Sequence, residues 1–172
     1  MSVSAEYDAL ENLLVSGETM PYKNKFRKIL FCTDFNTDAM TAFHYTLNIA
    51  DGNEDSEIII FHAIPEPDAQ FWKSYIYEVE DVDKKAKSDI DKKIAEVYAP
   101  GIPDGIIWTS QFAVGNVGEE ILLAADKNNV DLIVIGRGAG PNMINRMLGN
   151  FTEKVIRKAH FPVLVVPDEA ED

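Results

Sequence analysis

The stretch "IVIGRGAGPNMINRMLGNFTEKVIRKAHFPVLVV", residues 133–166, decides the fold that we predict for this chain. It opens with an apolar run and continues into a loop with glycines at 136, 138 and 140. A helical pattern follows at 150–160, and a second apolar run, PVLVV, occupies 162–166. Strand, glycine loop, helix and strand in this order are typical of a parallel βαβ unit.

The same alternation extends backward through the chain. Fully apolar strands are predicted at 29–32, 57–64, 106–114, 131–136 and 162–166, with helices between them. The helix at 84–99 is predicted to bury Ala86, Ile90, Ile94 and Val97, and 65–83 reads as a long loop. We therefore predict a three-layer α/β fold, an open five-stranded parallel sheet with helices on both faces. Ligands of such sheets bind beyond the carboxyl ends of the strands, where the strand order reverses.

Charge and composition limit the function classes. The chain has 172 residues and a formal net charge of −13, so it lacks the basic surface on which nucleic-acid and membrane binding depend. Its only cysteine, Cys32, cannot form an internal disulfide, which favours a cytoplasmic location. We divide the chain into an N-terminal helix and linker (1–24), one domain (25–167) and an acidic tail (168–172).

Asp34 directly follows the first predicted strand, where a carboxylate can accept hydrogen bonds from a ribose hydroxyl or an adenine amine. It could instead cap the next helix, as could Asn36 or Asp38. A calcium loop is disfavoured, because Ala39 and Tyr45 stand where that loop needs Gly and Glu. An aspartyl-phosphate enzyme stays a remote alternative, since its usual second acid is replaced by Asn36.

The glycine loop has two interpretations. Gly136, Gly138 and Gly140 could bring backbone N–H groups and the following helix N-terminus to a phosphate, or form only the turn between strand and helix. Their spacing is not that of the dinucleotide fingerprint, and no P-loop is present. The three histidines, 44, 62 and 160, have no metal-ligand spacing, and no serine lies in a nucleophile elbow. We therefore predict no catalytic residue and no metal ligand.

Four segments together carry a resemblance: KILFCTDFN (28–36), IIIFHAI (58–64), DLIVIGRGAG (131–140) and LGNFTEKVIRKAHFPVLVV (148–166). Over about residues 25–167 the chain resembles the universal stress protein family, whose fold is that of the adenine-nucleotide alpha hydrolases. One branch of the family binds ATP through G-x2-G-x9-G-S/T, and the resemblance implies ATP, with Mg²⁺ or Mn²⁺ as an accompanying ion.

By this resemblance Asp34 recognises the adenosine part with Thr33 beside it, and the backbone of Ala63 meets the adenine. Gly136 and Gly149 match the first and last glycines of the motif. The remaining positions that the resemblance places at the nucleotide are Arg137, Gly138, Ala139, Gly140, Arg146, Asn150 and Phe151.

Two positions depart from the motif. Ala139 stands where the second glycine is expected, although Gly138 and Gly140 flank it and could re-route the loop. Asn150 replaces the Ser or Thr, offers an amide donor to a phosphate, and forms a capping-box pattern with Glu153. Arg137 and Arg146 could supply cations or lie in solvent.

The resemblance implies a stress-response regulator or sensor that binds ATP or a related adenine nucleotide and hydrolyses it slowly at most. It also implies a homodimer through the last strand, Val163 to Val166, which would otherwise be a bare sheet edge. The alternative is a nucleotide-free dimer that acts as an interaction scaffold.

Overall fold

The computed structural model describes residues 26–53, 55–65, 82–137 and 150–167, with the backbone alone for 82–86 and 150. The N-terminal helix predicted within 1–24 and the acidic tail at 168–172 lie outside these ranges. The elements in chain order are β1 (Lys28–Cys32), α2 (Thr37–Asp51), β2 (Glu57–Pro65), α4 (Val82–Tyr98), a 3₁₀ turn (Ala99–Gly101), β3 (Ile107–Gly115), α5 (Val117–Asn128), β4 (Leu132–Gly136), α6 (Asn150–Lys158) and β5 (Val163–Val166).

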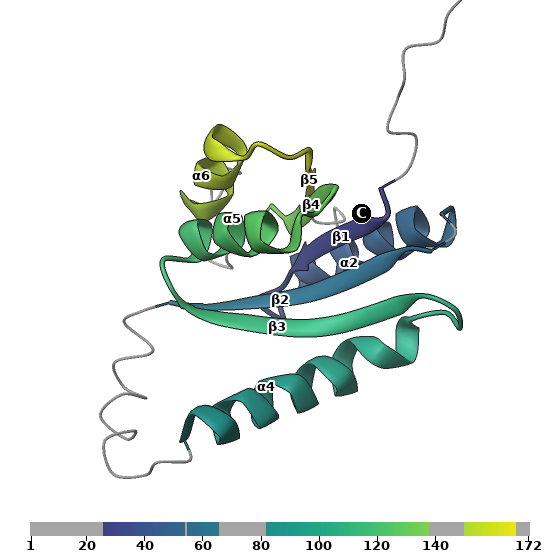
Figure 1. Cartoon of the computed structure of the whole chain (residues 1–172), viewed down its shortest axis with the longest axis horizontal. Coiled ribbons are helices and arrows are strands. Elements are labelled where there is room, and N and C mark those ends of the chain that lie inside the picture. Colours follow the sequence, from purple (N-terminus) through teal and green to yellow (C-terminus); the bar gives the residue numbers. More distant parts are fainter. Residues whose placement is uncertain (1–25, 54, 66–81, 138–149, 168–172) are drawn as a thin grey trace, which may run out of the picture.

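The five strands form one parallel sheet in the order β3-β2-β1-β4-β5 (Figure 1). This confirms the predicted α/β fold and the predicted strands. The prediction holds because an apolar strand is buried on both of its sides only where helices cover both faces of the sheet. The strand order reverses at β1: the chain adds β2 and β3 on one side of it and β4 and β5 on the other. The crevice between the ends of β1 and β4 is therefore the expected ligand position.

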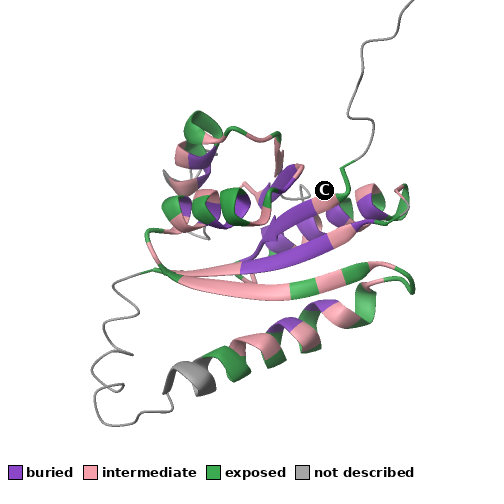
Figure 2. Cartoon of the chain, viewed as in Figure 1, coloured by how far each residue is buried: buried purple, intermediate pink, exposed green. Residues whose placement is uncertain are grey.

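Helices cover both faces of the sheet, and Figure 1 shows α4 opposite α5 and α6. Alternation along β1 decides which core each side chain joins. Ile29 and Phe31 pack with residues of α2 and α4, whereas Leu30 and Cys32 pack with residues of α5 and α6. The buried positions gather on the central strands (Figure 2). None of the described helices is long and apolar enough to cross a bilayer.

The predicted apolar face of α4 is wrong at Val97, and the side chain of Ala86, also predicted there, lies outside the described residues. Ile94 is fully buried and Ile90 packs against the core, but Val97 is 40% exposed and Tyr98 is fully buried in its place. The ring of Tyr98 packs edge-on against Phe31, with 5.3 Å between the ring centroids. Tyrosine carries a large apolar ring with a polar tip, and this tip finds a partner inside the protein, as described below.

Gly136, at the end of β4, is required by the packing of α2. A Cβ at this position would lie 3.0 Å from the backbone carbonyl of Asp38 and 3.0 Å from its Cβ. Asp38 lies in the first turn of α2 and is buried. The first glycine of the loop therefore permits close contact between a strand and a helix, whether or not a phosphate binds nearby.

We expect Gly136→Ala to lower the free energy of unfolding by about 1–3 kcal/mol, because the added methyl group overpacks the contact with α2. Urea denaturation measures this change. The control is Gly52→Ala at the end of α2, where the Cβ would meet only backbone oxygens at 3.7 Å and the backbone is helical. That substitution should be neutral or stabilise the fold by up to about 1 kcal/mol. Equal effects of the two substitutions would contradict the packing role of Gly136.

Candidate functional site

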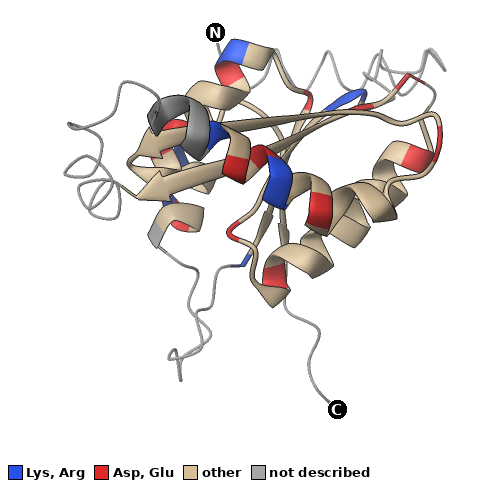
Figure 3. Cartoon of the chain, turned by 90° about the horizontal axis from the view of Figure 1, so that it is seen from below, with Lys and Arg blue, Asp and Glu red and all other residues tan. Residues whose placement is uncertain are grey.

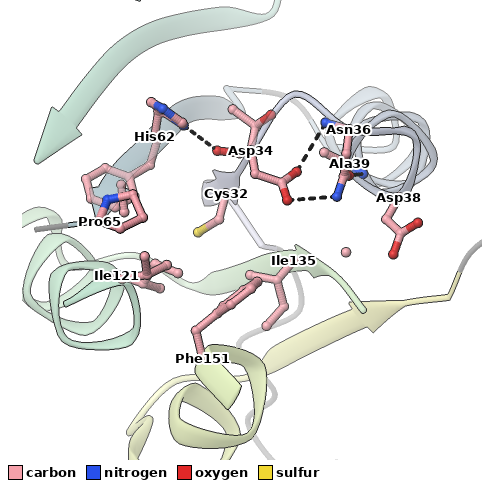
Figure 4. A pocket seen from close by; sticks show the side chains of 15 residues that line it. Cys32, Asp34, Asn36, Asp38, Ala39, His62, Pro65, Ile121, Ile135 and Phe151 are labelled. Carbon is pink, nitrogen blue, oxygen red and sulfur yellow. Dashed lines mark hydrogen bonds between the residues drawn. The ribbon is translucent and has the colours of Figure 1, made fainter. Parts of the chain in front are cut away.

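A cavity of about 370 Å³ opens at the carboxyl ends of β1, β2 and β4, at the point where the strand order reverses (Figure 4). Its size falls within the range of small-molecule sites. Its lining residues are Cys32, Thr33, Asp34, Asn36, Asp38, Ala39, Phe61, His62, Ala63, Pro65, Val117, Ile121, Ile135, Gly136 and Phe151.

The floor of the cavity is apolar. Strand register places Phe61, Cys32 and Ile135 side by side on three neighbouring strands. Figure 4 shows the ring of Phe151, from α6, beside Ile135, with Ile121 of α5 also directed into the cavity. Burial raises the pKa of the Cys32 thiol well above its usual range, so it stays protonated and acts as a small apolar group. The floor can therefore bury a flat apolar ligand group.

Asp34 lies on the rim and is exposed to solvent. The N-terminal cap of α2 is Asn36, whose side-chain oxygen accepts a hydrogen bond from the Ala39 N–H at 2.9 Å. Asn36 in turn donates to the Asp34 carboxylate from its backbone N–H at 3.2 Å and its side-chain amide at 2.7 Å (Figure 4). The capping role that Asp34 could have taken thus belongs to Asn36, and the Asp34 carboxylate is oriented at the rim.

Thr33, just before it, makes all its polar contacts inside the protein. Its N–H donates to the Phe61 carbonyl at 2.9 Å, and its carbonyl accepts from Nδ1 of His62 at 2.8 Å. Its hydroxyl accepts from the Phe35 N–H at 2.9 Å and is hydrogen-bonded to the Tyr98 hydroxyl. Thr33 is therefore better suited to fix the loop than to contact a ligand through its hydroxyl.

His62 is held in one tautomer. Because a carbonyl only accepts, Nδ1 must carry the proton toward Thr33, which leaves Nε2 as an acceptor in the neutral ring. Burial lowers the pKa of His62, the hydrogen bond to Thr33 opposes this, and Lys93 lowers it further. The imidazole is therefore neutral at pH 7, and its Nδ1–H is already bonded to the Thr33 carbonyl.

The backbone of Ala63, on β2, is directed into the cavity beyond the end of β1. The β1–β2 ladder ends where the Thr33 N–H donates to the Phe61 carbonyl. Alternate residues of a strand direct their N–H and C=O groups to the same side, so Ala63 directs both groups toward β1, beyond the last residue of that strand. One donor and one acceptor are thus presented together at the edge of the apolar floor.

The structure brings together five of the predicted site residues, which line the cavity: Thr33, Asp34, Ala63, Gly136 and Phe151. Arg137 does not line it. The Arg137 Nε atom is buried and has no hydrogen-bond partner among the described residues, while its N–H donates to the Val166 carbonyl. Gly138, Ala139, Gly140, Arg146, Gly149 and the side chain of Asn150 lie outside the described part of the chain, so their predicted contacts stay predictions.

Sequence reasoning missed most of the apolar floor, although a signal for it exists. Cys32, Phe61 and Ile135 lie at or near the carboxyl ends of their strands, and in a parallel sheet those ends meet at one edge. Val117 and Ile121, from the first turns of α5, depend on how that helix packs, which the local pattern does not contain.

The described lining offers a ligand three kinds of contact. The described residues bring together no group of three or more His, Cys, Asp or Glu side chains that could hold a metal ion. They offer an apolar slot, a backbone donor and acceptor at its edge, and a carboxylate at its rim. The N-terminal end of α6 contributes Phe151 to the lining.

Comparisons with known proteins agree with this fold. Universal stress protein MJ0531 of Methanocaldococcus jannaschii is 26% identical over 170 residues, which cover 95% of this chain and 92% of that protein. The solved structure of the hypothetical protein MJ0577 superposes with a TM-score of 0.68 at 27% identity, covering 85% of this chain and 99% of that one. A universal stress protein in complex with cAMP superposes with a TM-score of 0.55 at 20% identity, covering 85% of this chain and 100% of that one.

The sequence model of the Universal stress protein family matches residues 25–167, which include every described strand and helix. The chain belongs to the universal stress protein family.

Proposed function

We propose that this protein binds ATP or a related adenine nucleotide in the cavity between β1 and β4, and that it acts as a stress-response regulator or sensor. The observation that carries the proposal is the apolar slot at the point of strand-order reversal, with the Asp34 carboxylate oriented on its rim. The structure of a family member in complex with cAMP, an adenine nucleotide on the same fold, supports it.

The base would occupy the apolar floor. Adenine presents an acceptor and an amine donor on one edge, and these complement the N–H and C=O groups that Ala63 directs into the crevice. Cys32, Phe61 and Ile135 would contact the ring faces. This placement leaves the ribose at the rim, where its hydroxyls can donate to the Asp34 carboxylate.

The phosphates would extend toward the N-terminal end of α6. A helix N-terminus offers free backbone N–H groups and a positive dipole end to an anion. The backbone of Arg137 lies beside this end, since its carbonyl accepts from the Thr152 hydroxyl of α6 at 3.5 Å. Mg²⁺ or Mn²⁺ would accompany the phosphates, since the described part of the chain brings together no group of three or more His, Cys, Asp or Glu that could hold a metal ion.

Fast catalysis is not part of the proposal. The histidine in the cavity, His62, has its Nδ1 bonded to the Thr33 carbonyl, and the Cys32 thiol is protonated at neutral pH. Neither is set up as a nucleophile or as a base with an oriented partner. Hydrolysis of ATP would therefore be slow at most. A cytoplasmic location, where a free thiol such as Cys32 stays reduced, completes the proposal.

The binding test has two parts. Freshly purified protein is denatured and the released small molecules are identified by mass spectrometry, and the nucleotide-free protein is then titrated with ATP and Mg²⁺ in a calorimeter.

We expect Asp34→Asn to weaken binding roughly 10- to 100-fold, because it removes the charge that the ribose hydroxyls contact. Asp104→Asn, at an exposed position outside the cavity, should leave affinity unchanged. Absence of a released nucleotide together with no heat at millimolar ATP would rule out the proposal.

One observation favours the alternative, a nucleotide-free dimer that acts as a scaffold. Asp34 and Asp38 line the cavity, and no Lys or Arg is among its described lining residues. The chain as a whole has 29 acidic and 16 basic residues, and acidic positions lie on several elements (Figure 3). If the titration shows no nucleotide binding, this alternative becomes the better account.

Both functions include a homodimer through β5, which lies at the edge of the sheet. The carbonyls of Pro162 and Val166 accept hydrogen bonds from Ile133 and Arg137, on the β4 side. Val163 and Val165 therefore direct their backbone groups outward, where a second copy of β5 can pair with them. Ile156 of α6, which contacts β5, is 44% exposed and would be covered by the same partner.

We expect Val165→Pro to weaken dimerisation roughly 10- to 100-fold, because it removes an outward N–H in each subunit and leaves the β4–β5 ladder intact. Sedimentation velocity at micromolar concentrations measures the change. Val165→Thr, which keeps the N–H and the branched Cβ, is the control and should remain dimeric. A wild-type protein that sediments only as a monomer would exclude the dimer.

A further inference from the structure

The loop between β1 and α2 contains an aromatic residue in an unfavourable backbone conformation. Phe35 has a φ of 64°, in the left-handed region, where a residue with a Cβ is disfavoured. Such a conformation persists only where the surrounding contacts determine it, and it is found most often at functional sites. Here it lies between Asp34, on the rim of the cavity, and Asn36, the cap of α2.

One hydrogen bond within this loop and one from α4 fix its backbone. The Phe35 N–H donates to the Thr33 hydroxyl at 2.9 Å, and the same hydroxyl is hydrogen-bonded to Tyr98 of α4. Thr33 and Tyr98 are both buried, so neither hydroxyl can exchange its partner for water at low cost. The Tyr98 hydroxyl therefore sets the rotamer of Thr33 that receives the Phe35 N–H.

Three side chains enclose the ring of Phe35. The ring of His62 lies 4.9 Å away between centroids, and the ring of Tyr98 is stacked at 6.0 Å. The Lys93 ammonium lies over the ring, 4.1 Å from its centroid. Tyr98 and Lys93 both belong to α4, so this helix supplies two of the three contacts that keep Phe35 in place.

We infer that Tyr98 is a positioning residue for the Asp34 carboxylate, acting through Thr33 and Phe35. Tyr98 does not line the cavity, so it reaches the ligand site only through these two residues. The inference rests on the proposed function insofar as Asp34 contacts ribose hydroxyls. Loss of the Tyr98 hydroxyl leaves the Thr33 hydroxyl to find another partner, releases the Phe35 N–H and lets Asp34 move from its place on the rim. The apolar floor, built from other strands and helices, is untouched.

The test compares two ligands on the full chain: ATP and 2′,3′-dideoxy-ATP, which lacks the ribose hydroxyls. We expect Tyr98→Phe to weaken ATP binding roughly 5- to 15-fold, the value of one hydrogen bond or slightly more. The affinity for the dideoxy analogue should not change. Tyr45→Phe, at a half-exposed position on α2, is the control and should change neither affinity. Equal losses for both ligands, or no loss for ATP, would overturn the inference, since a merely structural role affects both ligands alike.

A second measurement needs no ligand and so separates this inference from the proposed function. The backbone and side-chain amides of Asn36 donate to the Asp34 carboxylate, so their NMR resonances report on the position of that carboxylate. In Tyr98→Phe these resonances should shift away from their wild-type positions. Phe35→Asn, which tolerates a positive φ and removes the ring, should have the same effect. Unaltered Asn36 resonances in both folded variants would overturn the inference. Absence of ATP binding with altered resonances would reject only the nucleotide proposal.

Discussion

Pairing of β1 on both of its edges is the constraint on which the site depends. Because β2 and β4 occupy the two edges, the chain that leaves β1 at Cys32 must turn out of the sheet. β2 continues past this point with β3 as its remaining partner, which leaves a crevice beside Ala63. The cavity is therefore a consequence of strand order, and the residues around it determine what can enter.

Much of the fold is readable from the sequence because the strands are buried on both faces. Runs such as "KILFC" and "LIVIG" have no polar face, and only a sheet covered by helices accommodates them. The buried face of α4 shows where this reasoning stops. Positions 97 and 98 both suit a helix stripe, and the one that is buried, Tyr98, has its hydroxyl bonded to Thr33, a residue 65 positions earlier in the chain.

The site was predictable in part, and for a similar reason. The ends of the predicted strands and the family resemblance together place Asp34 and the backbone of Ala63 at the candidate site. They do not tell which residue, Asp34 or Asn36, caps α2. Both residues can cap a helix by local chemistry. The left-handed conformation of Phe35 makes the choice, and contacts from α4 and His62 hold that conformation, so no short window of sequence contains the answer.

The acidic character of the protein determines how a nucleotide would be held. Asp34 and Asp38 belong to the described lining and no Lys or Arg does, so our proposal gives the apolar floor and the Asp34 rim a large part in holding the nucleoside. If one carboxylate holds the ribose of a nucleotide whose base is buried, the position of that carboxylate must be closely fixed. By our inference the contacts of Phe35 with Tyr98 and Lys93 restrict Asp34 before a ligand arrives, so that less conformational freedom would be lost on binding, and this would account for a strained loop held by a second helix.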